Sequence, residues 1–295
     1  MRAVAATILF VVLVAAPAGS AARRQERDAI AYVRASCCRA QVYLVNADGS
    51  ANRQVTKNLR RPPEGDYTPG WSPDGKQLVF VRATGRVANL YVVNATGGGV
   101  RRVTRTFGSD QTPDWSPNGR EIAFASAALK PGVDLADIFV VRPNGSGLRA
   151  LTREVGAGDP VWSPDGRQIA FARQKPAGIY VMNADGSARR RVTTGPSDRQ
   201  PDWSPDGTQI LFVRQLRGPN AEIFVVHPDG SGLRRITDNT VYDGSPDWSP
   251  DGTRIVFSSV RGNENVYVMN SDGTAVMRLT RGGAADPVWR PAQIH

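Results

Sequence analysis

The stretch Trp71-Ser72-Pro73-Asp74-Gly75 decides the fold, because close copies of it recur along the chain. Five of the six tryptophans open such a stretch, with Asp or Asn at its fourth position, and the sixth opens Trp289-Arg290-Pro291. Successive tryptophans are 44, 47, 41, 45 and 41 residues apart. A repeat of this length is typical of a solenoid or a propeller. The repeat residues are Trp71, Trp115, Trp162, Trp203, Trp248 and Trp289.

Each repeat has the pattern of four short strands. Seven and nine residues after each of the first five tryptophans stands an apolar pair such as Leu78 and Phe80, which predicts a half-buried strand. A β-branched and aromatic run follows, as in Ile179-Tyr180-Val181-Met182, and then a short strand such as Arg191-Val192-Thr193. Together with the strand that carries the tryptophan, this pattern predicts four-stranded antiparallel blades.

The two ends of the chain predict how the first and last repeats combine. Three predicted strands precede the first tryptophan strand, at residues 30–33, 42–45 and 53–56, and only six residues follow Trp289. We therefore expect the last inner strand to join the first three. This arrangement gives a six-bladed β-propeller over residues 30–295, an all-β ring with no open sheet edge between its first and last blades.

The repeat also resembles that of a known family. Pro-x-Trp-Ser-Pro-Asp-Gly, then Ile-x-Phe, then Ile-Tyr-Val-Met-Asn-x-Asp-Gly is similar to the repeat of the TolB-like β-propellers, over residues 30–291. The resemblance implies a propeller that acts as a binding module in the cell envelope. We expect no counterpart of the N-terminal α/β domain of TolB, since only the short segment 23–29 separates the predicted signal peptide from the first predicted strand. Similar repeats occur in peptidase propellers, so the resemblance is more specific for fold than for function.

The first 22 residues have the pattern of a secretory signal peptide. Arg2 is followed by an apolar run over residues 3–16 and by small residues at 17–22. The run is too short for an ordinary membrane span, and nothing after residue 22 is long and apolar enough to be one. We expect an exported protein of the periplasm, cell envelope or extracellular space, without a transmembrane segment after signal cleavage.

The two cysteines are adjacent, at Cys37 and Cys38. An oxidising compartment allows a vicinal disulfide between them, but neighbouring Cα atoms about 3.8 Å apart would strain it. The alternatives are a small loop staple or two unpaired thiols. A structural metal site would need two more soft ligands, and the only histidines are His227 and His295, so no metal is assigned.

The small number of histidines favours a protein without catalytic activity. His227 stands where other repeats carry Asn in a hairpin turn, so a Ser–His–acid triad has one poor base. Gly230-Ser231-Gly232 lacks the strand-turn-helix setting of a nucleophile elbow. Glycoside hydrolysis needs only two carboxylates, so the alternative is an envelope enzyme acting on a polysaccharide, a glycosidase or a lyase.

The net charge of +10 is concentrated on the short fourth strands. This basic rim protects the outer sheet edges from edge-to-edge pairing, or it binds an anionic envelope polymer. We expect no nucleic-acid binding, because aromatic and basic residues are not interleaved on a platform. The rim consists of Arg101, Arg102, Arg149, Arg189, Arg190, Arg191, Arg234, Arg235 and Arg278.

Acidic residues recur on the predicted innermost strands. Four stand five positions before their tryptophan, and the two repeats without an acid there carry one three positions before. Each Asp either satisfies backbone groups within its own blade or contributes to an acidic channel mouth. Such a mouth would bind a basic segment of an envelope protein, or a cation such as Ca²⁺; no other cofactor is expected. The predicted mouth consists of Asp66, Asp110, Asp159, Asp198, Asp243 and Asp286.

Overall fold

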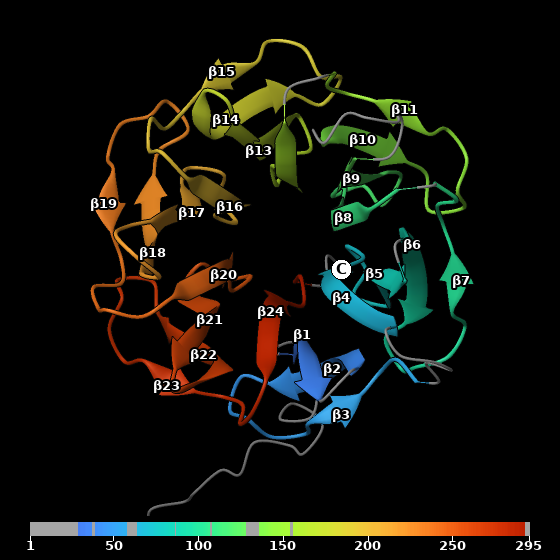
Figure 1. Cartoon of the computed structure of the whole chain (residues 1–295), viewed down its shortest axis with the longest axis horizontal. Coiled ribbons are helices and arrows are strands. Elements are labelled where there is room, and N and C mark those ends of the chain that lie inside the picture. Colours follow the sequence, from blue (N-terminus) through green and yellow to red (C-terminus); the bar gives the residue numbers. More distant parts are fainter. Residues whose placement is uncertain are drawn as a thin grey trace, which may run out of the picture.

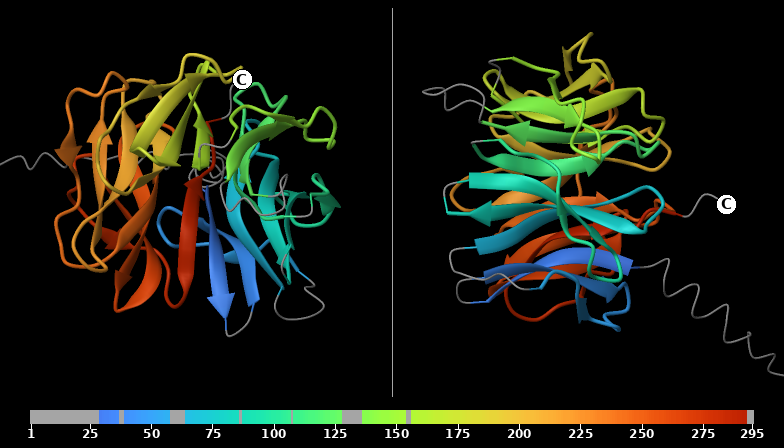
Figure 2. Two further views of the ribbon diagram at one scale, coloured as in Figure 1. Left: turned by 45° about the horizontal axis from the view of Figure 1, so that its top comes forward. Right: turned by 90° about the vertical axis from the view of Figure 1, so that its right-hand side faces the viewer.

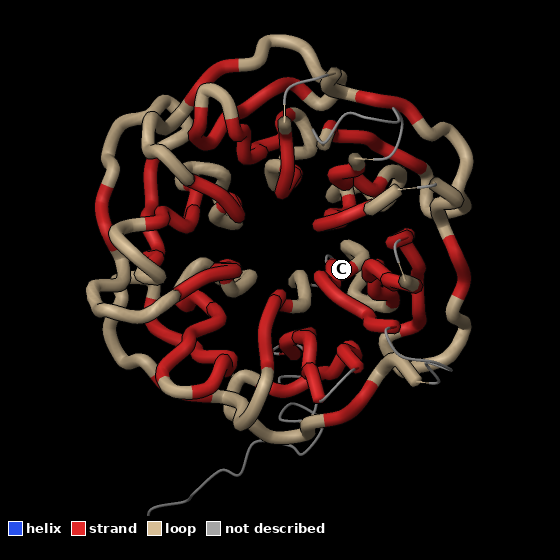
Figure 3. Tube along the Cα trace, in the orientation of Figure 1, coloured by secondary structure: helices blue, strands red, loops and turns tan. Residues whose placement is uncertain are grey.

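The structure, a computed structural model, describes residues 29–36, 39–57, 64–85, 87–106, 108–127, 136–153 and 156–292. Within these ranges all regular structure is β, arranged as sheets around a central axis (Figures 1 and 3). From the side the molecule is a thick disc of twisted sheets (Figure 2). The predicted signal peptide, the segment 23–28, Cys37, Cys38 and His295 lie outside the described residues.

Four of the sheets are antiparallel and have four strands each, in the order innermost to outermost along the chain. The first contains β8 (Asp110–Trp115), β9 (Ile122–Ser126), β10 (Asp137–Val141) and β11 (Arg149–Ala150). The second contains β12 (Ala157–Trp162), β13 (Gln168–Gln174), β14 (Ala177–Asn183) and β15 (Arg190–Arg191). The third contains β16 (Asp198–Trp203), β17 (Ile210–Gln215), β18 (Ala221–Val226) and β19 (Arg234–Arg235). The fourth contains β20 (Asp243–Trp248), β21 (Arg254–Arg261), β22 (Asn263–Asn270) and β23 (Met277–Arg278).

The remaining eight strands form one sheet, which corrects the predicted blade count. Its order is β24-β1-β2-β4-β5-β6-β7, with β3 paired to β2. The small residues Ala40 and Gly65 allow β2 and β4 to approach and pair in parallel, so two predicted blades are continuous. The prediction of a ring of six separate four-stranded blades was therefore wrong: the structure has four such blades and one eight-stranded sheet. Its strands are β1 (Ala29–Ser36), β2 (Arg39–Asn46), β3 (Arg53–Gln54), β4 (Glu64–Trp71), β5 (Gln77–Thr84), β6 (Val87–Asn94), β7 (Arg101–Arg102) and β24 (Ala284–Trp289).

Strands from the two ends of the chain pair with each other in this sheet. β24 runs antiparallel to β1, with Ile30 opposite Trp289 and Arg34 opposite Ala284. The backbone N–H of Arg290 donates a hydrogen bond of 2.8 Å to the carbonyl of Ala29. The pairing of the Trp289 segment with the first strand was predicted from the sequence and is confirmed.

The tryptophans are buried between neighbouring sheets. All six are between 3% and 8% exposed. Trp162 illustrates their packing: it lies in one apolar cluster with Ile138 and Val140 of the preceding sheet and with Ile169 and Phe171 of its own. Because an indole buries about 150–250 Å² of surface, each tryptophan contributes much of the apolar area between two sheets. The burial of the tryptophans between neighbouring sheets was predicted from the sequence, and the structure shows it.

Candidate functional site in the central channel

The innermost strands β4, β8, β12, β16, β20 and β24 surround the central axis (Figure 1). Between them lies a channel with an open cavity of about 160 Å³, lined by the residues one, two and three positions before each tryptophan. The residue two positions before is proline in all six strands, so the walls carry rigid backbone. The side chains that differ between the strands are those one and three positions before.

A bulge in each inner strand determines which side chains face this channel. In β12 the register with β13 shifts between Gly158 and Val161, and Asp159 within the bulge has a φ of +50°. The other five inner strands have the same shift, with a φ between +44° and +52° three positions before the tryptophan. A left-handed residue is costly for any L amino acid other than glycine. A bulge of this kind re-aims the neighbouring side chains.

Asp66 and Asp198 lie inside their sheets and do not line the narrow channel. Asp66 receives two hydrogen bonds from Arg82, at 2.7 and 2.9 Å. Asp198 receives two from Arg214, at 2.7 and 2.8 Å, and a third from the hydroxyl of Thr193. Both carboxylates are almost fully buried. A bidentate pair with arginine is a strong interaction when it is shielded from water, so these two aspartates hold the inner strand to the second strand.

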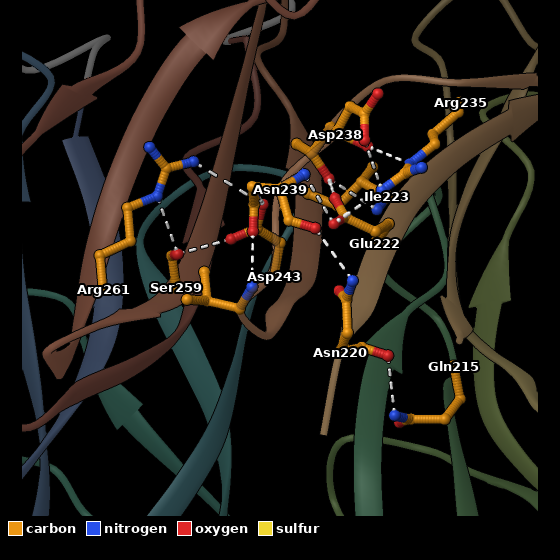
Figure 4. A network of polar contacts seen from close by, with 12 residues as sticks. Gln215, Asn220, Glu222, Ile223, Arg235, Asp238, Asn239, Asp243, Ser259 and Arg261 are labelled. Carbon is orange, nitrogen blue, oxygen red and sulfur yellow. Dashed lines mark hydrogen bonds and ion pairs between the residues drawn. The ribbon is translucent and has the colours of Figure 1, made fainter. Parts of the chain in front are cut away.

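Asp110 and Asp243 are buried in networks of hydroxyl groups. Asp110 accepts hydrogen bonds from Thr104, Thr106 and Ser126 at 2.5 to 2.9 Å, and burial raises its pKa. Asp243 accepts hydrogen bonds from Ser259 and Asn239, with Arg261 3.8 Å away, as Figure 4 shows. The same picture shows that Glu222 is bound by Arg235 and by the backbone N–H of Asn239. The hydroxyl of Thr237 also donates a hydrogen bond to Glu222. The carboxylates of Asp110, Asp243 and Glu222 thus bind donors within the sheets and do not line the channel.

Asp159 and Asp286 are the two predicted mouth residues that line the channel. Asp159 accepts a hydrogen bond of 3.0 Å from the backbone N–H of Gln200 on the next inner strand. Asp286 accepts one of 3.0 Å from the hydroxyl of Ser245 on the preceding strand. Burial raises the pKa of both carboxyl groups. The structure therefore divides the six predicted aspartates into four within the sheets and two at the channel.

Three further carboxylates complete the acidic lining: Asp114, Asp202 and Asp247, each directly before its tryptophan. Each accepts a hydrogen bond of 2.7 or 2.8 Å from the backbone N–H of a tryptophan on another inner strand. Burial raises the pKa of Asp114 to about 7. Burial, together with nearby carboxylates, raises the pKa of Asp202 to about 8 and raises the pKa of Asp247 well above its ordinary value. The Asp-Trp dipeptides can be read from the sequence. The sequence does not reveal the bulge that turns these aspartates toward the channel, so their position there could not be predicted.

The channel is acidic in an otherwise basic protein. Five aspartates line it, and no Lys, Arg or His belongs to its described lining. No three His, Cys, Asp or Glu side chains among the described residues are placed to hold a metal ion. The arrangement, one carboxylate on each of five strands, suits a positively charged group with several donors, such as an ammonium or guanidinium.

Two rim arginines contact the next sheet along the chain. The guanidinium groups of Arg101 and Arg190 donate hydrogen bonds to the carbonyls of Pro143 and Pro228. These contacts favour a structural role for part of the basic rim.

His227 lies in an exposed hairpin turn, as its position in the repeat predicts. Its Nδ1 is 3.1 Å from the hydroxyl of Ser231, which in turn donates to Asp229 at 2.7 Å. Asn183, Ser187 and Asp185 form the equivalent turn in another repeat. The contact between His227, Ser231 and Asp229 is therefore part of the hairpin turn that the repeats share.

A search of the described residues found no helix that is long and apolar enough to cross a membrane.

Comparisons with known proteins agree with the architecture. Among solved structures, TolB from Acinetobacter baumannii is 23% identical with a TM-score of 0.79, over 91% of this chain and 68% of that one. The putative TolB from Agrobacterium tumefaciens is 26% identical with a TM-score of 0.70, over 88% of this chain and 91% of that one. An oligogalacturonate lyase in complex with manganese is 20% identical with a TM-score of 0.59, over 87% of this chain and 75% of that one, which shows a shared fold alone.

A comparison with curated proteins found no match. The TolB beta propeller domain family, by contrast, matches residues 11–133 and 197–293. Because these ranges make up more than half of the chain, this protein belongs to the TolB beta propeller domain family.

Proposed function

We propose that this protein is an exported, non-catalytic binding module that takes a basic segment of an envelope protein into its central channel. One observation carries the proposal: five aspartates line the channel without a basic side chain among the described lining residues, in a chain of net charge +10. Ionised carboxylates in a channel with protein walls concentrate their electrostatic field and attract a cationic partner, whereas the net positive charge of the chain keeps its copies apart.

The hydrogen bonds of these aspartates also support binding of a cation. Asp114, Asp202 and Asp247 each accept a tryptophan N–H, and a carboxylate has capacity for further donors. Because burial raises the pKa values of these three carboxyl groups, they keep protons near neutral pH. A bound ammonium or guanidinium group would lower these pKa values and favour the ionised form. Binding of a basic segment should therefore release protons near neutral pH.

Export follows from the predicted signal peptide, and the binding role agrees with the shared TolB-like fold. The alternative predicted from the sequence was an enzyme acting on a polysaccharide. The similarity to the oligogalacturonate lyase does not support this alternative, because at 20% identity it shows a shared fold alone.

The test is calorimetric titration of the mature protein with a pentalysine peptide in low salt. The double variant Asp159→Asn/Asp286→Asn should lower the affinity about tenfold or more, as expected for loss of 1–2 kcal/mol of charge interaction. The matched control Asp48→Asn/Asp185→Asn removes the same charge from two exposed turns, where Asp48 and Asp185 accept hydrogen bonds from Ser50 and Ser187. Equal affinities for the channel variant and the control would refute the channel as the site.

A calcium arm separates a metal ion from a basic segment as the ligand. A ligand at 100 times its dissociation constant stabilises a protein by about 2.7 kcal/mol, which a thermal melt detects. Pentalysine binding without a calcium-induced rise in melting temperature would support the basic segment alone. If instead a polyanion binds, and Arg102→Gln/Arg234→Gln abolishes that binding, the rim becomes the site.

A further inference from the structure

Lysine and arginine recur at one position of the repeat, directly after a buried threonine. Four of the six repeats have Lys or Arg there, where the chain leaves one outermost strand and crosses to the next innermost strand. In all four, the threonine hydroxyl accepts a hydrogen bond of 2.8 to 3.0 Å from a backbone N–H of the neighbouring strand. Because this bond fixes the backbone in the same way each time, the basic residues stand at equivalent positions. They are Lys57, Arg105, Arg153 and Arg281.

These crossings lie on one of the two flat faces of the disc. Hydrogen bonds join equivalent positions of neighbouring inner strands, as between Asp159 and Gln200, so the inner strands all begin at the same face. The hairpins between the second and third strands of each repeat lie on that face too, because the four strands are antiparallel. Three of these hairpins add a basic residue, namely Arg39, Lys175 and Arg217.

These seven residues, which we call the basic face, carry positive charge without a counterion from the protein. All seven are exposed. None has a hydrogen bond or an ion pair with another residue that the structure describes. Among the described side chains on this side of the disc, the exposed acid is Asp238, and it pairs with Arg235 at 2.9 Å.

The opposite face has a different balance of charge. Its hairpin turns carry exposed aspartates such as Asp165, and basic side chains lie beside acidic ones. Arg167 is 3.9 Å from Asp165, and Arg149 is 3.0 Å from Glu121. Acids and bases partly neutralise each other there, so the two faces differ in the positive charge that is free to attract an anionic partner.

We propose that the basic face binds the surface of a bilayer that contains anionic lipids. The repeat places its basic groups at equivalent levels around the axis, so they can meet a flat anionic surface together. A linear polyanion would follow one path across the face and reach fewer of them. Docking in this way stands the channel axis upright on the membrane and leaves the opposite face free. The proposal does not depend on the role of the channel.

The test is sedimentation of the protein with vesicles of phosphatidylcholine that contain about 30% phosphatidylglycerol, in low salt. The wild type should bind these vesicles and should not bind phosphatidylcholine alone. Each basic residue close to an anionic surface adds a factor of about five in affinity, so Arg105→Gln/Arg153→Gln/Arg281→Gln should bind about 100-fold more weakly. The matched control Arg120→Gln/Arg142→Gln/Arg167→Gln removes the same charge from exposed turns of the opposite face and should keep the wild-type affinity.

Salt keeps the test decisive if a variant does not fold, which its melting temperature would reveal. About 0.5 M sodium chloride should release the wild type from the vesicles, because it screens charges that are more than a few ångströms apart. The proposal is overturned if the wild type stays bound in that salt or if both triple variants lose affinity equally. It is also overturned if the wild type binds soluble polyglutamate but no anionic vesicle, since the partner would then be a polymer.

Discussion

Asp114→Asn is the perturbation that most directly tests the electrostatics of the channel. Burial raises the pKa of this carboxyl group from its ordinary value of 3.8 to about 7. In the folded protein the group therefore keeps a proton that it loses in the unfolded chain between pH 4 and 7. The free energy of unfolding must then decrease as the pH rises through this range, because the folded state binds more protons than the unfolded state.

The size of this effect follows from the pKa. A rise from 3.8 to about 7 corresponds to about 4 kcal/mol for one isolated group. Because the side chain faces the channel and is partly solvated, we expect about half of that, ~2 kcal/mol. Asparagine can still accept the N–H of Trp162 through its amide oxygen, so the variant keeps the hydrogen bond and loses only the charge.

Urea denaturation at pH 4 and pH 8 measures the difference. At pH 4 the variant and the wild type should have nearly equal free energies of unfolding, and at pH 8 the variant should be more stable by ~2 kcal/mol. Asp185→Asn serves as the control, because Asp185 is on an exposed turn and its pKa is lowered by hydrogen bonds from Ser187. A difference between Asp114→Asn and wild type that does not change with pH would refute the assignment of a raised pKa.

Three further predictions concern the framework. Trp203→Ala should lower the free energy of unfolding by about 3–5 kcal/mol in urea denaturation, and an unchanged value would mean that the indole is not a core residue. Deleting residues 284–295 removes the strand that pairs with β1, so the melting temperature should fall sharply; an intact melt would show that this pairing contributes little. Asp198→Asn should cost about 3–5 kcal/mol, because it leaves the partly buried Arg214 without its carboxylate, and a cost below 1 kcal/mol would argue against a structural role.

The strands could be predicted from the sequence because their signal is local. Alternation of apolar residues, as at Leu78 and Phe80, depends only on the period of two of a half-buried strand. The pairing of β24 with β1 was also predictable, since the chain carries one inner strand too many at one end and one too few at the other. The number of separate blades could not be predicted in the same way. It depends on the approach of Ala40 to Gly65, a contact that no local pattern encodes.

The candidate site was predicted only in part, and the bulge is the physical reason. In a regular strand, positions five, three and one before the tryptophan share one face. In this protein the left-handed residue at position three breaks the alternation, so Asp198 turns into its sheet while Asp202 faces the channel. Threonine, glutamine, serine and aspartate occupy position three, and none of them signals a positive φ in advance.

The distribution of acids over the repeats relates the framework to the proposed channel site. Every inner strand keeps one aspartate from the predicted set, but in β12 and β24 it has moved from the sheet interior to the channel. The carboxylates of Asp159 and Asp286 therefore do not hold the inner strand to the second strand of its own sheet, and each accepts a hydrogen bond from another inner strand instead. Local rules of stability are relaxed in proteins mainly where a function requires it. In β12 and β24 this position instead supplies Asp159 and Asp286 to the channel that we propose as the binding site.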